Sequence, residues 1–183
     1  QVKVVRSPKA AIILTGNELI SSGESLTRGK VYESNSILLK SALMQQGIEP
    51  ELISSTEDNL EATINILKKA FLTADIIIVS GGISVGDYDF VKQALEDLDV
   101  KEIFYKVRQK PGKPLFFGKK EQSFIFALPG NPASTLTTFY VYVLPLLCRL
   151  KGSQSTGLIR LQIPIAHDFD SKEPRALFLK ATI

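Results

Sequence analysis

The sequence is poor in the residues that build disulfides and soft-metal centres. Its 183 residues include one cysteine, one histidine and no tryptophan. Cys148 alone cannot form an internal disulfide, and a zinc site made of cysteine and histidine is excluded by count. Such cysteine usage is typical of a reducing, cytoplasmic setting. We do not expect the single histidine, His167, to be catalytic, because no serine or cysteine pattern accompanies it.

The excess of one sign of charge over the other is also small. The formal net charge of +3 is too small to indicate nucleic acid as the main partner. We find no signal peptide and no apolar run that we judge long enough to cross a bilayer, so no membrane partner is expected. The hydrophobic share of 44% and the charged share of 22% are those of a soluble globular protein. Because the chain opens on Gln1 and stops at Ile183 inside an apparent strand, we interpret it as a piece of a longer protein.

The stretch Ser80–Asp89 carries the strongest local signal. It follows the apolar run Asp75–Val79, typical of a buried strand, and precedes helical spacing from Phe90. A glycine-rich turn between strand and helix brings backbone N–H groups to an anion, and Asp87 and Asp89 add carboxylates beside it. This predicts a phosphate held with a divalent cation. The alternative is an ordinary tight turn in which Asp87 caps the helix.

Alternation of strands and helices from residue 10 to residue 98 predicts the fold class. We expect a three-layer α/β/α domain with a mostly parallel sheet over residues 1–152. The loops after its strands, at 15–18, 56–58 and 80–89, would share one rim. Apparent strands at 158–165 and 176–183 predict that residues 153–183 begin a truncated all-β domain.

Element boundaries follow from turn and cap residues. We expect one helix to begin at Ser34 or Asn35 and another at Asp58, which lies three residues before a glutamate. A long helix begins at Asn131 and Pro132 and runs to about residue 150. Further strands are expected at 10–14, 49–54, 76–79, 102–107, 115–117 and 123–127, with a hairpin turn at 118–122.

Charged residues cluster in two patterns. Period-two spacing would place Lys106, Arg108 and Lys110 on one strand face, which favours an oxyanion or phosphate site over a merely solvated basic face. Glu18 and Asp58 join the aspartates of the glycine-rich stretch at strand ends, where magnesium with phosphate is the expected occupant. Alternatively, Asp58 is a helix cap and Glu18 a solvent-facing carboxylate.

Four motifs occur in a fixed order: Thr15–Leu19, Ser80–Gly86, Lys110–Pro114 and Leu128–Pro132. Together they resemble the molybdopterin molybdenumtransferase family, of the type related to the gephyrin E domain, from about Pro8 onward. The resemblance implies magnesium-dependent insertion of molybdate into adenylylated molybdopterin with release of AMP. It also implies a homodimer in the full-length protein, whose active site draws on a neighbouring subunit.

Several residues match functional positions of that family. The implied catalytic residues are Asp58, Asp89, Lys106 and Lys110, and the implied magnesium ligands are Asp87 and Asp89. The implied substrate-binding residues are Glu18, Gly81, Gly82, Ser84, Gly86, Lys110, Lys113, Pro114 and Lys180.

Two positions depart from the family pattern. Asn59 stands where a second aspartate is usual, and Lys180 stands where an arginine is usual, which keeps the charge but loses the bidentate fork. Two other functions stay open: ATP-dependent molybdopterin adenylyltransferase, and a non-catalytic pterin-binding or scaffold module. A flavodoxin-like nucleotide-binding protein is the remaining alternative. We also expect the chain to bind or turn over substrate poorly by itself, because the family's other domains are absent from it.

Overall fold

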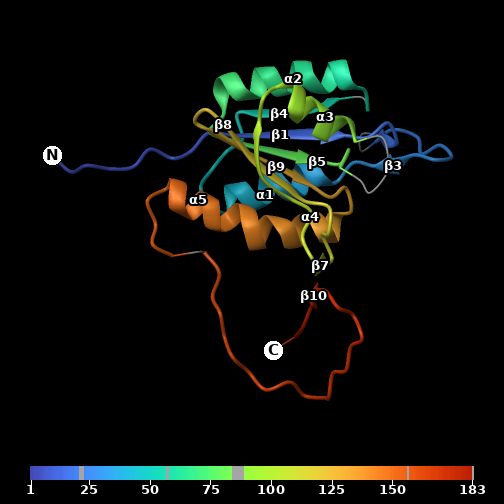
Figure 1. Cartoon of the computed structure of the whole chain (residues 1–183), viewed down its shortest axis with the longest axis vertical. Coiled ribbons are helices and arrows are strands. Elements are labelled where there is room, and N and C mark those ends of the chain that lie inside the picture. The colour runs from blue at the N-terminus through green and yellow to red at the C-terminus, as the bar shows by residue number, and fades with distance from the viewer. Residues whose placement is uncertain (21–22, 57, 84–88, 156, 183) are drawn as a thin grey trace.

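A six-stranded sheet forms the centre of the computed structural model, which describes residues 1–20, 23–56, 58–83, 89–155 and 157–182. The strand order is β4-β1-β5-β9-β8-β6 (Figure 1). The first four strands run parallel, and β8 is antiparallel to both of its neighbours. The expected mostly parallel sheet is therefore confirmed. The strands are β1 (Ala10–Thr15), β4 (Leu52–Thr56), β5 (Ile76–Ser80), β6 (Lys101–Tyr105), β8 (Phe116–Lys120) and β9 (Ser123–Leu128).

Helices cover both faces of this sheet (Figure 1). One face carries α1 (Asn35–Met44) and the helical run made of α4 (Pro132–Thr138), η1 (Phe139–Val143) and α5 (Leu144–Leu150). The other carries α2 (Leu60–Thr73) and α3 (Phe90–Asp97). Residues of β1 alternate between the two cores, with Ile12 in one and Ile13 in the other, and both are fully buried. Burial on both faces explains why β1 and β5 are continuous apolar runs.

The long helical run from Pro132 to Leu150 has the predicted extent, and it is also apolar. By length and composition it could cross a membrane, so the expectation that no apolar run is long enough was wrong. However, 44% of the apolar stretch of this helix is buried inside the molecule, and Phe139 and Leu147 pack in the core on the sheet. The π-helical segment η1 ends two residues before Pro145, whose ring lacks an N–H and crowds the preceding turn.

Several predicted boundaries need correction. Asn59, not Asp58, caps α2, because its Oδ1 accepts a hydrogen bond from Ala62 N at 2.8 Å. The helix α1 begins at Asn35, but no Ser34 side chain caps it; the Glu33 carboxylate accepts from Ser36 N at 2.8 Å instead. Three strands are displaced from the predicted ranges: β4 starts later than residue 49, β6 ends before 107, and β8 extends through 120. Two short strands, β2 (Leu19–Ile20) and β3 (Val31–Tyr32), pair within the predicted loop region.

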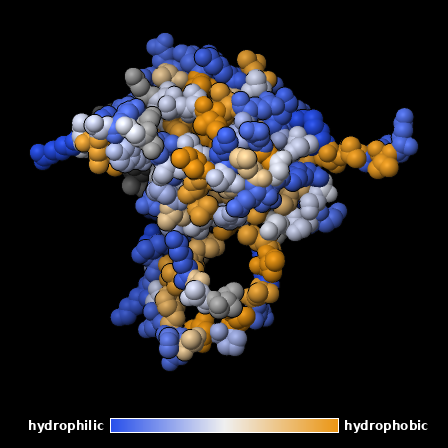
Figure 2. All heavy atoms as spheres, turned by 180° about the vertical axis from the view of Figure 1, so that it is seen from behind, coloured by the Kyte–Doolittle hydropathy of each residue, from blue (hydrophilic) through white to orange (hydrophobic). Residues whose placement is uncertain are grey.

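The C-terminal segment differs most from its prediction. Residues 158–165, all of them described, form no strand, and Ile159 is 88% exposed. The segment loops away from the body and returns as β10 (Ala176–Leu177), which pairs with β7 (Gln109–Lys110) (Figure 1). Apolar side chains lie along this loop (Figure 2). Its alternating apolar pattern is real, but a strand also needs a partner, and the described residues supply one only to β10.

Candidate functional site

The carboxyl ends of four parallel strands lie at one edge of the sheet, as predicted. Because β8 is antiparallel to both neighbours, β6 runs in the same direction as β9, and its carboxyl end lies at this edge too. The segment between β6 and β8 therefore reaches the same rim as the loops after β1, β4, β5 and β9. Parallel sheets bind ligands at such edges, where successive loops diverge to opposite faces.

Gly81 and Gly82 form a glycine turn that rests directly on the end of β1. Both have a left-handed backbone, with φ of +90° and +63°. A Cβ at Gly81 would lie 2.2 Å from the carbonyl oxygen of Thr15, and one at Gly82 would lie 2.3 Å from Thr15 Oγ1. Gly81 N also donates to Leu128 O at 3.3 Å. Any side chain would collide with β1, so glycine is required here by contact as well as by conformation.

The other residues predicted in this stretch are divided by what the structure describes. Ser84, Gly86 and Asp87 lie outside the described residues. Asp89 is described, and it caps α3: its Oδ1 accepts from Lys92 N at 2.9 Å and its Oδ2 from Tyr105 Oη at 3.1 Å. Burial raises the pKa of Asp89, and burial together with Asp89 raises the pKa of Tyr105 to about 12. This pair joins the start of α3 to the end of β6.

Lys106 follows Tyr105 in the chain and lies over its ring, with Nζ 4.6 Å from the ring centroid. Lys92 Nζ is 4.7 Å from the same centroid. The backbone of Lys106 is left-handed, with φ of +60°, a conformation that costs a non-glycine residue about 1–3 kcal/mol. Its N–H donates to Leu115 O at 2.8 Å, which holds the segment in place.

The predicted strand face of three cations is therefore wrong in its geometry. The strand ends at Tyr105, and the left-handed Lys106 interrupts the extended chain. Lys106, Arg108 and Lys110 are nevertheless all exposed, while Gln109 is buried between them. The alternation in exposure remains because Gln109 is buried, not because β6 continues through this segment.

The cationic turn, defined here as Lys110–Pro114, is fastened to the long helix. Gln109 Nε2 donates to Pro111 O at 3.0 Å, and Tyr142 Oη donates to Gln109 Oε1. A Cβ on Gly112 would lie 2.6 Å from Thr138 Cγ2, so this turn approaches α4 as closely as a glycine permits. The turn contains a cis peptide bond before Pro111. Lys113 is exposed and Pro114 half-buried.

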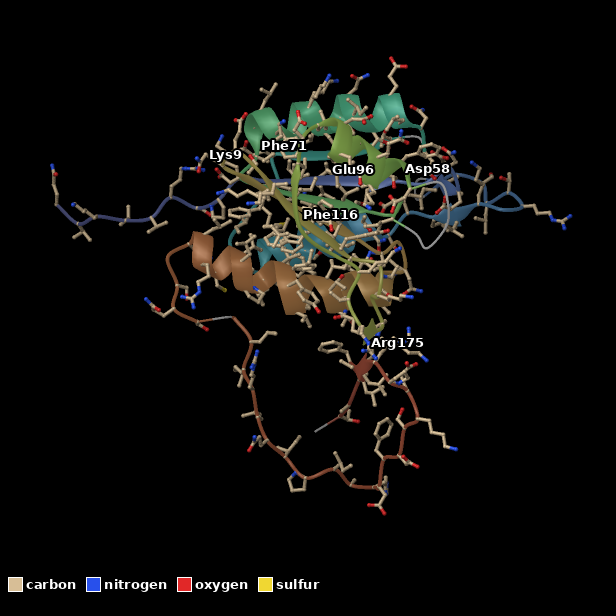
Figure 3. The ribbon with its side chains drawn as sticks, viewed as in Figure 1. Lys9, Asp58, Phe71, Glu96, Phe116 and Arg175 are labelled. Carbon is tan, nitrogen blue, oxygen red and sulfur yellow. The ribbon has the colours of Figure 1, made fainter. Side chains whose placement is uncertain are left out.

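A carboxylate that the sequence did not single out faces this turn. Glu173 Oε2 lies 3.8 Å from Lys110 Nζ and also pairs with Arg175, on the returning C-terminal segment (Figure 3). The Arg175 guanidinium holds the pKa of Glu173 down to about 2. The Lys110 side chain is still 61% exposed. Phe178 N donates to Lys110 O, and the predicted Lys180 lies exposed two residues further on.

Asp58 and Glu18 occupy the opposite end of the rim. Asp58 and Asn17 bond reciprocally: Asp58 N donates to Asn17 Oδ1 at 3.1 Å, and Asn17 N to Asp58 Oδ2 at 3.4 Å. This contact holds the loops after β1 and β4 together. The exposed Glu18 folds back over Gly16, since a Cβ there would lie 2.9 Å from its carboxylate.

A cavity of about 250 Å³ lies where the loops after β1, β5 and β9 meet. Asn35, at the start of α1, closes one side. Its Nδ2 donates to Ser80 Oγ at 2.9 Å and to Gly130 O at 2.7 Å, so one amide joins two loops. The sequence presented Asn35 only as a helix start, because nothing local indicates contacts this distant. The lining also includes Thr15, Glu18, Ser80, Gly81, Gly130 and Pro132. A wider hollow of about 730 Å³ lies beside the cavity, around Lys30, Glu33 and Thr56.

The described residues do not bring the predicted acidic side chains together as metal ligands. Within them, no group of three histidine, cysteine, aspartate or glutamate side chains could hold a metal ion. Asp58 is bonded to the loop after β1, and both oxygens of Asp89 already accept hydrogen bonds. The remaining predicted ligand, Asp87, lies outside the described part of the chain.

Comparison with known proteins gives a consistent picture. The family model described as "Probable molybdopterin binding domain" matches residues 11–149. Molybdopterin molybdenumtransferase of Staphylococcus epidermidis is 33% identical over 185 residues, covering 100% of this chain and 44% of that protein. The Nostoc sp. protein of the same name is 42% identical over 155 residues, covering 83% of this chain and 36% of that protein. The chain thus spans less than half the length of these relatives.

Solved structures show the same resemblance. The crystal structure of a molybdopterin biosynthesis MoeA protein from Pyrococcus horikoshii has a TM-score of 0.71 and 33% identity, covering 82% of this chain and 37% of that one. Molybdenum cofactor biosynthesis protein B has a TM-score of 0.61 at 14% identity, covering 82% of this chain and 97% of that one, which shows a shared fold alone.

Proposed function

This chain belongs to the family of probable molybdopterin binding domains, and from that premise we propose that it carries the pterin site of an enzyme of molybdenum cofactor biosynthesis. The proposed reaction is the insertion of molybdate into adenylylated molybdopterin, with release of AMP. Relatives named molybdopterin molybdenumtransferase cover the whole chain and support this choice. Because the chain spans less than half of those relatives, the activity is proposed for the complete protein.

One observation carries the proposal: the glycine turn and the cationic turn lie at the same edge of one sheet. The first presents bare backbone beside a cavity, where a flat ring or a phosphate can approach closely. The second presents Lys110 on a turn that Gln109 joins to Tyr142 of η1 and that Gly112 brings against Thr138 of α4. A substrate that is part heterocycle and part anion needs both kinds of surface.

The chemistry required of these residues is mainly electrostatic. Molybdate is a dianion and the adenylyl group carries a phosphate, so their approach is opposed by charge repulsion. Lys106, Lys110 and Lys113 would neutralise these oxyanions, and a fixed arrangement of such charges costs little reorganisation during the reaction. Asp89 and Tyr105 would act by holding α3 and Lys106 in position. Lys180 would add a further cation from the C-terminal segment.

Magnesium is proposed only as a requirement of the reaction. The described carboxylates do not form a set of ligands for it, as shown above, and we assign no step to the ion. Phosphate oxygens of an adenylylated substrate are hard ligands that bind magnesium well. A magnesium titration of AMP release with the complete protein tests this requirement directly.

We also propose that the complete protein is a cytoplasmic homodimer acting on small molecules, without nucleic acid or membrane as partner. The small net charge and the packing of the long apolar helix on the sheet support this. Residues 1–152 would form the pterin-binding domain, and 153–183 would begin a separate β domain. The exposed apolar side chains of the second segment support that division.

The test is molybdate-dependent AMP release from adenylylated molybdopterin by the complete protein. Removing one fixed charge-stabilising group from an active site commonly costs about 100-fold in rate. We expect a loss of that order in Lys110→Ala and in Lys106→Ala. Lys119→Ala is the matched control, because Lys119 lies on β8 over Phe124 and away from the rim.

Other outcomes distinguish the alternatives. ATP-driven adenylylation of molybdopterin, without AMP release on adding molybdate, would assign the protein to the adenylyltransferase class. Pterin binding without either activity would indicate a binding or scaffold module. Full activity in both rim variants would contradict the roles given to Lys106 and Lys110.

A further inference from the structure

Asn35, which lines the cavity, has a side-chain acceptor without a hydrogen-bond partner among the described residues. Both hydrogens of its side-chain amide are engaged, one by Ser80 Oγ at 2.9 Å and one by Gly130 O at 2.7 Å. Its Oδ1 atom is buried, yet it has no hydrogen-bond partner among the described residues. Buried polar atoms without a partner are uncommon in folded proteins, so this one requires an explanation.

The orientation of this amide is set by its neighbours. Exchanging its oxygen and nitrogen would place Oδ1 against the Gly130 carbonyl oxygen, with two acceptors facing each other. The Ser80 hydroxyl lies 3.5 Å from Pro129 O, to which it donates, so it accepts from Asn35. The contacts on both sides therefore fix the position of the nitrogen, and the oxygen is left without a donor among the described residues.

A second buried atom in the same cavity is also unpartnered. Thr15 lines the cavity and is 2% exposed, and its Oγ1 has no hydrogen-bond partner among the described residues. Asn35 and Thr15 come from different elements, α1 and β1, so two independent side chains leave polar atoms unpaired around one space. The cavity is thus lined by Gly81 and by two residues whose buried polar atoms lack a partner among the described residues.

We propose that Asn35 Oδ1 accepts a hydrogen bond from the amino-bearing edge of a substrate heterocycle, and so makes the cavity select an amino ring over its oxo analogue. The proposal rests on the proposed function, whose substrate contains two such rings, a pterin and an adenine. At about 250 Å³ the cavity is smaller than pockets that enclose a whole drug-sized ligand, about 300–1,000 Å³. It therefore suits one ring, with the rest of the substrate extending along the rim.

The experiment pairs one protein change with one ligand change. Equilibrium dialysis with the complete protein would measure Kd for pterin against lumazine, which carries oxygen in place of the 2-amino group. A second pair is AMP against IMP, which differ in the same way at the adenine ring. The wild-type protein should prefer the amino ligand of one pair by about 10-fold, the value of one hydrogen bond of ordinary strength.

Asn35→Ala should reduce that preference to less than about 2-fold, because the acceptor is gone. Any rearrangement of the neighbouring loops weakens the binding of both ligands of a pair alike and leaves the ratio of their Kd values unchanged. Ser80→Ala is the control: it removes one partner of the Asn35 amide but keeps Oδ1, so it should lower affinity without lowering preference. If Asn35→Ala loses the preference for pterin over lumazine, Asn35 contacts the pterin ring. If it loses the preference for AMP over IMP, Asn35 contacts the adenine ring.

Two results separate failure of this inference from failure of the proposed function. Wild-type protein that binds none of the four ligands would overturn the proposed function itself. Wild-type protein that binds them without preference, or Asn35→Ala that keeps the preference, would overturn the inference alone. An absence of preference in the wild-type protein overturns the inference even if the alanine variant does not fold.

Discussion

The variant Gly81→Ala tests how closely the glycine turn rests on β1. Gly81 has φ of +90°, and an added Cβ would lie 2.2 Å from the carbonyl oxygen of Thr15. That oxygen belongs to the backbone of a strand that is buried on both faces and paired with a strand on each side. Unlike the end of a flexible side chain, it cannot move aside without disturbing the sheet.

The expected cost has two parts. A left-handed backbone costs an alanine about 1–2 kcal/mol more than a glycine. Forcing an extra carbon into a packed site costs about 1–3 kcal/mol. Together they lower the free energy of unfolding by about 2–5 kcal/mol. Each kcal/mol shifts the melting temperature of a domain of this size by about 2–4 °C, so we expect a decrease on the order of 10 °C.

Thermal unfolding of three alanine variants separates these parts. Gly47 also has a positive φ, +69°, but nothing lies within 4 Å of its added Cβ, so Gly47→Ala should show the backbone cost alone. Gly130 meets only Gly81 Cα at 3.5 Å, an ordinary contact, and its substitution should change the melting temperature little. If Gly81→Ala melted no lower than Gly47→Ala, the close approach of the turn to β1 would be refuted.

Three further predictions concern charged groups. Hydrogen bonding to Arg6 lowers the pKa of Asp75, so the ionised carboxylate stabilises the fold above its unfolded pKa of about 3.9, and this stabilisation is lost as pH falls through the folded pKa. In urea unfolding, Asp75→Asn should therefore have a lower free energy of unfolding than the wild type at neutral pH, and the difference should shrink below about pH 4. Tyr105→Phe removes a hydrogen bond to Asp89 and should raise the pKa of that carboxyl further, measured by NMR titration; a decrease would contradict the assignment. Glu173→Gln removes the carboxylate facing the cationic turn and should tighten molybdate binding, measured by calorimetry, while changing stability little. Unchanged affinity would show that Glu173 does not compete with molybdate for Lys110.

The architecture could be predicted because it depends on local patterns. Short apolar runs bounded by turns marked the buried strands, and alternation with helical spacing indicated a parallel sheet. Parallel connection then placed the loops after the strands at one edge without knowledge of any contact. Asn131 as the cap of the long helix was also predicted, since a cap bonds only to its next few residues, here Ala133 and Ser134.

The features that the sequence could not predict depend on contacts between distant residues. Asn35 bonds to Ser80 and Gly130, and no spacing rule connects those positions. Lys106 was expected in an extended strand, but its N–H bonds to Leu115 and its backbone turns left-handed. The strands expected at residues 158–165 failed for a related reason: alternation records amphipathic character, whereas a strand forms only against a partner.

The position of β9 in the sheet has a consequence for protein synthesis. It lies between β5 and β8, although it is translated after β5, β6 and β8. Until β9 emerges from the ribosome, β5 has one unpaired edge, and its residues Ile76–Val79 are uncharged, β-branched and without proline. Such a segment with an open edge readily pairs with other chains. The nascent chain is therefore most prone to aggregation over this interval, and shielding of β5 by a chaperone would matter only until residue 128 has emerged from the ribosome.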